Sequence, residues 1–171
     1  MPHEPTSELN EYRLTTKQHF HMASILRRFS GPLGIRVVFI DDGREEFVED
    51  DSSLFMAKRA WSQEFEGPIC SAIEDKFIRE VQRVERGGDV VNHDAISRYH
   101  LLWVLRHHYA LNPLGEAAIF PDVGGTPPQE VEEWLEARNK VPVRQDGKVA
   151  GRFITTQSLK ADLAYQKNAE A

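Results

Sequence analysis

The chain of 171 residues contains a single cysteine, Cys70. One thiol excludes an internal disulfide, and it excludes a zinc site built on several cysteines of one chain. A sequence without disulfides is typical of a reducing compartment, so we expect a cytoplasmic protein. A domain of this length buries roughly 70% of the surface that its unfolded chain exposes, so it needs neither crosslinks nor a metal to fold.

Long apolar runs and basic charge are also scarce. No segment approaches the ~20 apolar residues of a membrane-spanning helix, and residues 1–13 lack the basic and apolar regions of a secretory signal. We therefore expect no membrane association. The 27 acidic residues outnumber the 21 basic ones, and the net charge of −6 disfavours general attraction to nucleic acid. A local basic patch is still compatible with this composition, and the arginines that could form it are Arg27, Arg28, Arg36, Arg44, Arg98 and Arg106.

The most apolar stretch of the chain runs from Asp94 to Ala110 and predicts a central helix. Apolar side chains point almost all round its axis between Leu101 and Leu105, and a helix that is apolar on every side is normally buried. Asn92 or Asp94 is a suitable N-terminal cap. We expect the other elements to pack around this helix, with Trp103 among its packing residues.

Shorter periodic segments predict the remaining helices. Thr15 to Gln18 has the capping-box pattern, which predicts a helix that continues to Phe29. Apolar residues recur at helical spacing from Ile69 to Arg86 and predict a second amphipathic helix. Further helices are expected at 54–61, at 126–140 with Thr126 as its cap and an apolar face of Val131, Trp134 and Leu135, and from Thr156 onward.

Two β-hairpins complete the expected fold. The first spans 35–48 about Asp41-Asp42-Gly43, with its return strand at an edge, and the second spans 141–153 about Asp146-Gly147. The sequence thus predicts a predominantly helical α+β fold, with five to six helices around the 94–110 helix. We expect a flexible N-terminus at 1–14, a helical core with a hairpin at 15–120, and a helix–hairpin–helix segment at 126–171 packed on the same domain.

Seven histidines raise the question of a metal or an acid–base site. On a helix, His19 and His21 would point about 200° apart, and His100 would lie about 10.5 Å from His107 along the axis. No local metal signature is present, so we expect neither a metal nor a cofactor. A catalytic base or ligand assembled from different elements stays open, with His19 and His107 as catalytic candidates and His21 and His108 as binding candidates.

Arg106 interrupts the apolar helix, and a buried guanidinium must be paired. The structural interpretation pairs it with an acid of the Ile69–Arg86 helix, such as Glu74 or Glu80, whereas the functional interpretation is a contact to an anion or phosphate. Structural ion pairs outnumber sites, so we favour the first. Cys70 lies beside an apolar stripe and is expected to be a small core residue rather than a nucleophile.

The segment from His19 to Phe29 resembles the opening motif of a bacterial domain-of-unknown-function family, number 4238. His19, Leu26, Arg27 and Phe29 match, Phe20 stands where tyrosine is usual, and His21-Met22-Ala23 replaces a Val-Pro-Gln sequence. The resemblance covers about residues 17–109. Some members are associated with bacterial defence against phage, so the resemblance implies a role in phage–host conflict, with His19 and Arg27 as the matching polar positions.

Three functional hypotheses follow. The preferred one is a binding protein that acts in phage–host conflict through contact with another protein. The second is a nuclease or related hydrolase, with His19 or His107 as base or ligand and Arg27 or Arg106 on phosphate. The third is a non-catalytic nucleic-acid-binding regulator, which requires a local basic face. Convergence of His19, Arg27, Arg106 and His107 on one pocket would favour an enzyme, and their dispersal would favour a binding protein.

Overall fold

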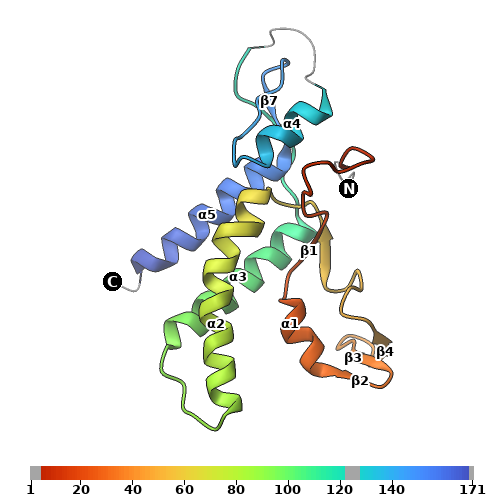
Figure 1. The fold of residues 1–171 in the computed structure, drawn as a ribbon, viewed down its shortest axis with the longest axis vertical. Coiled ribbons are helices and arrows are strands. Elements are labelled where there is room, and N and C mark those ends of the chain that lie inside the picture. The colour runs from red at the N-terminus through yellow and green to blue at the C-terminus, as the bar shows by residue number, and fades with distance from the viewer. Residues whose placement is uncertain (1–4, 122–127, 170–171) are drawn as a thin grey trace.

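The computed structural model describes residues 5–121 and 128–169, with side chains described up to residue 165. This part of the chain forms five α-helices and small antiparallel sheets (Figure 1), which confirms an α+β fold in which helices predominate. None of the helices in these ranges combines the length and the apolar character needed to cross a membrane.

Two long helices form the centre of the fold. Helix α2 (Cys70–Glu85) follows a π-helical turn at Phe65–Ile69, and helix α3 (His93–Leu111) packs against it. Both were predicted from periodicity and are confirmed. The side chain of Asn92 caps α3 as expected, since its Oδ1 accepts from the backbone N of Ala95 at 3.0 Å.

Helix α3 is buried on one face only, so the prediction of burial on every side is wrong. Its buried residues are Ala95, Tyr99, Leu102 and Arg106, which recur at helical spacing. Trp103 is 38% exposed, because α2 and α5 (Gly151–Ala169) cover the opposite side of the helix. The main buried core comprises Phe20, Trp61, Phe65, Cys70, Leu102 and Leu159.

The predicted helix from Thr15 to Phe29 is mostly absent. Residues Lys17–His19 form strand β1, which pairs antiparallel with β5 (Met56–Lys58), so the helix expected at 54–61 is also wrong. Gln18 explains the difference, because its buried amide donates to the backbone O of Trp61 at 2.9 Å and accepts from the backbone N at 3.2 Å. Only α1 (Ala23–Leu26) and a 3₁₀ turn at Arg27–Phe29 remain helical.

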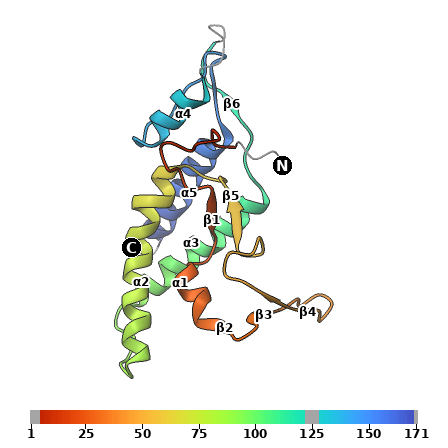
Figure 2. The same cartoon turned by 45° about the vertical axis from the view of Figure 1, so that its right-hand side comes forward.

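The predicted first hairpin is confirmed and gains a third strand. Strands β2 (Ser30–Gly31), β3 (Gly34–Val38) and β4 (Glu45–Val48) form one sheet in that order, with β4 at the edge as expected. Gly43 lies in the turn with a φ of +70°. Figure 2 shows that β2 continues from α1 and that the β3–β4 hairpin projects sideways from the helices.

The predicted second hairpin is wrong as a strand pair. Asp146-Gly147 forms a turn, with Gly147 at a φ of +75°, and Arg144 N donates to the Lys148 oxygen across it at 2.9 Å. Residues 141–145 form no strand, however, and β7 (Lys148–Val149) pairs with β6 (Ala117–Ala118). Helix α5 then begins at Gly151, earlier than the predicted start at Thr156.

Helix α4 (Gln129–Glu136) has the opposite orientation to the one predicted. Glu132, Glu133 and Glu136 are its buried residues, whereas Val131 and Trp134 are exposed and only Leu135 of the predicted apolar face is half-buried. The predicted cap Thr126 lies outside the described residues. The segment expected to be a flexible N-terminus is tied to this helix, since the backbone N and the hydroxyl of Ser7 donate to the Glu133 carboxylate at 2.6 and 2.7 Å.

Candidate functional site

His19 and Arg27, the two polar positions of the family resemblance, meet at one residue. Arg27 Nε donates to the Asp50 carboxylate at 2.6 Å, and His19 Nε2 lies 3.3 Å from the Asp50 backbone oxygen. Asp50 follows the end of β4 by two residues. The pair therefore connects the β1–α1 segment to the base of the projecting sheet.

His21 is held by Tyr99 of α3. Tyr99 Oη accepts from the backbone N of Met22 at 3.0 Å and is hydrogen-bonded to His21 Nδ1, 2.6 Å away. Burial lowers the pKa of His21, and burial also raises the pKa of Tyr99 to about 12. The lowered pKa favours the neutral imidazole at pH 7, and the contact docks α1 onto α3.

Arg106 is the centre of a buried ion-pair cluster. Its side chain is 2% exposed, and NH1 donates to Glu74 at 2.6 Å while NH2 lies 3.5 Å from Glu66. The pairing with Glu74 confirms the structural interpretation of this arginine. Glu66 also accepts from Trp61 Nε1 at 2.6 Å, and burial raises the pKa of its carboxyl. Both terminal nitrogens of Arg106 face carboxylates of the fold, while its buried Nε has no hydrogen-bond partner in the described structure. Because the side chain is 2% exposed, Arg106 is not presented to an external anion.

Cys70 lies beside this cluster and is fully buried, which confirms it as a core residue. Burial raises the pKa of its thiol to about 12, so the thiolate is not populated at neutral pH. The reactive cysteine that a nucleophilic mechanism needs is not provided at this position.

His107 and His108 are exposed on α3, and each lies next to an aromatic ring. The His107 ring meets the edge of Phe20 at 5.4 Å between centroids, and His108 meets Tyr109 at 5.1 Å. The four residues whose convergence would indicate an enzyme therefore lie in separate environments: His19 and Arg27 at Asp50, Arg106 in the core, and His107 on the surface. No three His, Cys, Asp or Glu side chains in the described ranges are grouped as metal ligands.

Sequence reasoning missed the buried acidic face of α4. Glu136 accepts from Arg59 at 2.7 Å and from Arg152 at 2.9 Å, and Glu132 accepts from Arg144 at 2.5 Å. Buried carboxylates are tolerated only when cations and hydrogen-bond donors surround them. No local signal indicates this network, because its arginines come from the residue after β5, the turn before β7 and helix α5.

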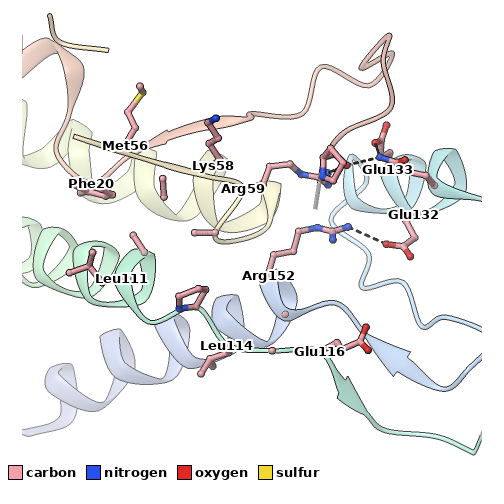
Figure 3. Close-up of a pocket in the computed structure, with 18 of the residues that line it drawn as sticks. Phe20, Met56, Lys58, Arg59, Leu111, Leu114, Glu116, Glu132, Glu133 and Arg152 are labelled. Carbon is pink, nitrogen blue, oxygen red and sulfur yellow. Dashed lines mark hydrogen bonds and ion pairs between the residues drawn. The ribbon is translucent and has the colours of Figure 1, made fainter. Parts of the chain in front are cut away.

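A cavity of about 1100 Å³ lies beside this network. Figure 3 shows an apolar wall with Phe20, Met56 and Leu111, and a charged end with Arg152 and Glu132. Arg152 donates to Glu132 at 3.3 Å, so the positive and negative charges of this pair neutralise each other in the cavity wall. None of the site residues predicted from the sequence lines this cavity.

The projecting β2–β3–β4 sheet carries exposed large apolar side chains. Within its three strands only Ile35 is buried. Val38 and Phe47 lie on the outward face, whereas Ile35, Val37 and Val48 lie on the other. The turns beside the strands add more, with Ile40 96% exposed and Leu33 72% exposed. We call the exposed apolar residues on this sheet, in its turns and in the adjoining 3₁₀ turn the sheet tip, which comprises Phe29, Leu33, Val38, Ile40 and Phe47.

Comparisons of the chain with protein-family models, with curated proteins and with solved structures find no match.

Proposed function

We propose that this protein works by binding another protein through the sheet tip, in phage–host conflict. The observation that supports the proposal is the near absence of a core in the β2–β3–β4 sheet, where Ile35 alone is buried. Small sheets need one apolar face covered to be stable in water. A surface of this kind marks an interaction site more often than an ordinary solvated face.

The energetics favour a covered state. Burying one large apolar side chain stabilises a complex by roughly 1.5–3 kcal/mol, and the sheet tip offers several such side chains. Arg36 and Glu45 form an ion pair on the same outward face as Val38 and Phe47. A central apolar contact with a polar margin is the arrangement found in protein–protein interfaces.

The shape of the sheet tip favours a different protein over a second copy of this chain. The sheet projects from the helical body (Figure 2), so a concave partner could enclose it on several sides. Two projecting tips cannot enclose each other, and interface cores require close shape complementarity. We therefore commit to a partner protein with an apolar groove.

His19 and Arg27, the two polar positions of the family resemblance, fit this proposal because they hold the base of the sheet. His19 and Arg27 both contact Asp50, immediately beyond β4. Their role in this interpretation is to orient the tip relative to the helices, and the phage-related setting comes from the resemblance alone.

A photo-crosslinking experiment in phage-infected bacteria tests the proposal. A benzophenone amino acid replaces Phe47 in the full chain, and a control carries it at Tyr165, which is 75% exposed on α5. We expect a discrete crosslinked protein at position 47 and none at 165. The purified partner should then bind the wild-type chain and lose at least tenfold in affinity for a Val38→Ser/Phe47→Ser variant. Equal crosslinking at both positions, unchanged affinity, or a homodimer crosslinked through position 47 would overturn the proposal.

A further inference from the structure

The basic patch that the sequence allows is neutralised in the structure. Each of its six arginines has a carboxylate partner, in the pairs Arg27–Asp50, Arg28–Glu85, Arg36–Glu45, Arg44–Glu46, Arg98–Asp94 and Arg106–Glu74. These arginines serve the fold of an acidic chain. Any basic side chains without a carboxylate partner therefore belong to other positions of the chain.

The solvent face of α2 carries such charge. Lys76, Arg79, Arg83 and Arg86 are spaced three, four and three residues apart, so they form one line along the helix, and all four are exposed. In the described parts of the chain, Lys76, Arg79 and Arg86 make no ion pair, and Arg83 has only a 3.6 Å contact to Glu80. Exposed carboxylates near this line in the described sequence include Asp75 on the helix and Asp89 next to Gly88. We call these four residues the basic stripe.

The end of the basic stripe is hollowed. A shallow depression of about 390 Å³ is lined by Arg79, Gln82, Arg83, Arg86 and Gly88. A Cβ at Gly88 would lie 3.0 Å from Arg83 Cγ, so glycine leaves room for the Arg83 stem against the loop. Three guanidinium groups therefore border one depression, an arrangement suited to a phosphate group.

We infer that the basic stripe binds the phosphate backbone of a nucleic acid. The stripe extends roughly 15 Å at 1.5 Å per residue, and one strand of a duplex carries a phosphate charge every ~3.4 Å of axis, so the four cations face a similar number of phosphates. No large apolar side chain lies on this line, whereas protein interfaces need an apolar core and membrane-surface helices need an apolar face. The inference is independent of the sheet tip, which lies on another element.

The salt dependence of binding follows from the number of contacts. With at most four phosphate contacts, the logarithm of the affinity falls against the logarithm of the salt concentration with a slope no steeper than about −3.6 for duplex DNA, or about −2.8 for a single strand. The measured slope therefore distinguishes binding to duplex DNA from binding to a single strand. Base identity should matter little, because a helix that contacts phosphates alone reads no sequence.

Fluorescence anisotropy of labelled nucleic acid measures the affinity of the full chain and tests the inference. The probes are a DNA duplex of about 20 base pairs and a single-stranded RNA of the same length, each titrated between about 50 and 200 mM salt. The test variant is Lys76→Gln/Arg79→Gln/Arg86→Gln. The control variant, Arg13→Gln/Lys17→Gln/Lys140→Gln, removes equal charge from exposed positions elsewhere. Circular dichroism checks that both variants fold.

We expect the wild-type chain to bind at least one of the two nucleic acids, and the control variant to bind it within about threefold of the wild type. The stripe variant should lose at least about tenfold in affinity at low salt, with a slope shallower by up to about 2.7 on duplex DNA. Absence of binding to either nucleic acid, an equal loss in both variants, or stripe-dependent binding of polyglutamate or anionic lipid vesicles in place of nucleic acid would overturn the inference.

Discussion

Replacing Arg106 by methionine is expected to destabilise the protein strongly. Methionine preserves much of the volume of the arginine side chain but removes the positive charge that pairs with both Glu74 and Glu66. The arginine side chain is 2% exposed, so this charge is buried. Breaking a buried ion pair typically costs 3–5 kcal/mol, since a carboxylate is left without its cation. The two glutamates are 20% and 17% exposed, so water can reach them, and we place the loss near the lower end, at about 3 kcal/mol.

Urea denaturation followed by tryptophan fluorescence measures this loss. Arg98→Met is the matched control on the same helix, because Arg98 pairs with an exposed Asp94 at 3.4 Å and should cost no more than about 0.5 kcal/mol. Adding Glu66→Gln and Glu74→Gln to the Arg106→Met variant should recover most of the lost stability, because no buried carboxylate then lacks a partner.

The pH dependence gives a second signature of the same cluster. Burial already raises the pKa of Glu66, and removing Arg106 should raise it further. The folded variant then binds a proton more tightly than the unfolded chain, so its deficit should be smaller near pH 5.5 than near pH 8. A loss below about 1 kcal/mol, or a deficit that neither pH nor the glutamine substitutions reduce, would refute the reasoning.

Three further predictions concern other parts of the fold. Burial lowers the pKa of His21, so the folded protein binds a proton at this site less tightly than the unfolded chain does. Folding stability should therefore decline as the pH falls below 6.5, the pKa of the unfolded side chain. In urea titrations at several pH values, His21→Gln should make this decline smaller. Cys70 should fail to react with Ellman's reagent in the native protein and react fully in denaturant. Gly147→Ala should cost at least twice as much as Gly43→Ala in unfolding free energy. Both glycines have a positive φ, which costs an alanine roughly 1 kcal/mol. Only at Gly147 would the added Cβ also clash with a backbone oxygen, that of Phe120, whereas a Cβ at Gly43 would meet no described atom within 4 Å.

The elements that the sequence predicts correctly are those defined by their own periodicity. Helices α2 and α3 have apolar residues at helical spacing over many turns, and Asn92 supplies a local cap. The first hairpin has a turn that requires positive φ at Gly43. These signals act over a few residues, so distant parts of the chain do not change them.

The wrong predictions involve residues whose partners are far away in sequence. Gln18 matches a capping box, but its amide bonds to the backbone of Trp61, 43 residues later, and holds a strand. The reversed orientation of α4 has the same origin, because acidic residues are expected to face water unless arginines of other elements surround them. Arg59 lies 77 residues before its partner Glu136, so no local pattern connects them.

The candidate site was only partly accessible from the sequence. The pairing of Arg106 with Glu74 was predictable, because a buried guanidinium needs an acid and the neighbouring helix offers one. The contact of His21 with Tyr99 and the meeting of His19 with Arg27 at Asp50 depend on a fold that the sequence did not reveal. The exposure of the sheet tip likewise depends on how the described elements pack, and the sequence alone does not show this.

A phage plating assay on bacteria that express the protein tests the proposed function most directly. We expect the wild-type chain to change the plating of at least one phage by tenfold or more, and the Val38→Ser/Phe47→Ser variant to lose this effect while keeping its unfolding midpoint. A Leu9→Ser/Ile119→Ser control, which alters exposed apolar residues elsewhere, should act like the wild type. Unchanged plating of every phage by the wild-type chain, or full activity of the sheet-tip variant, would contradict the account.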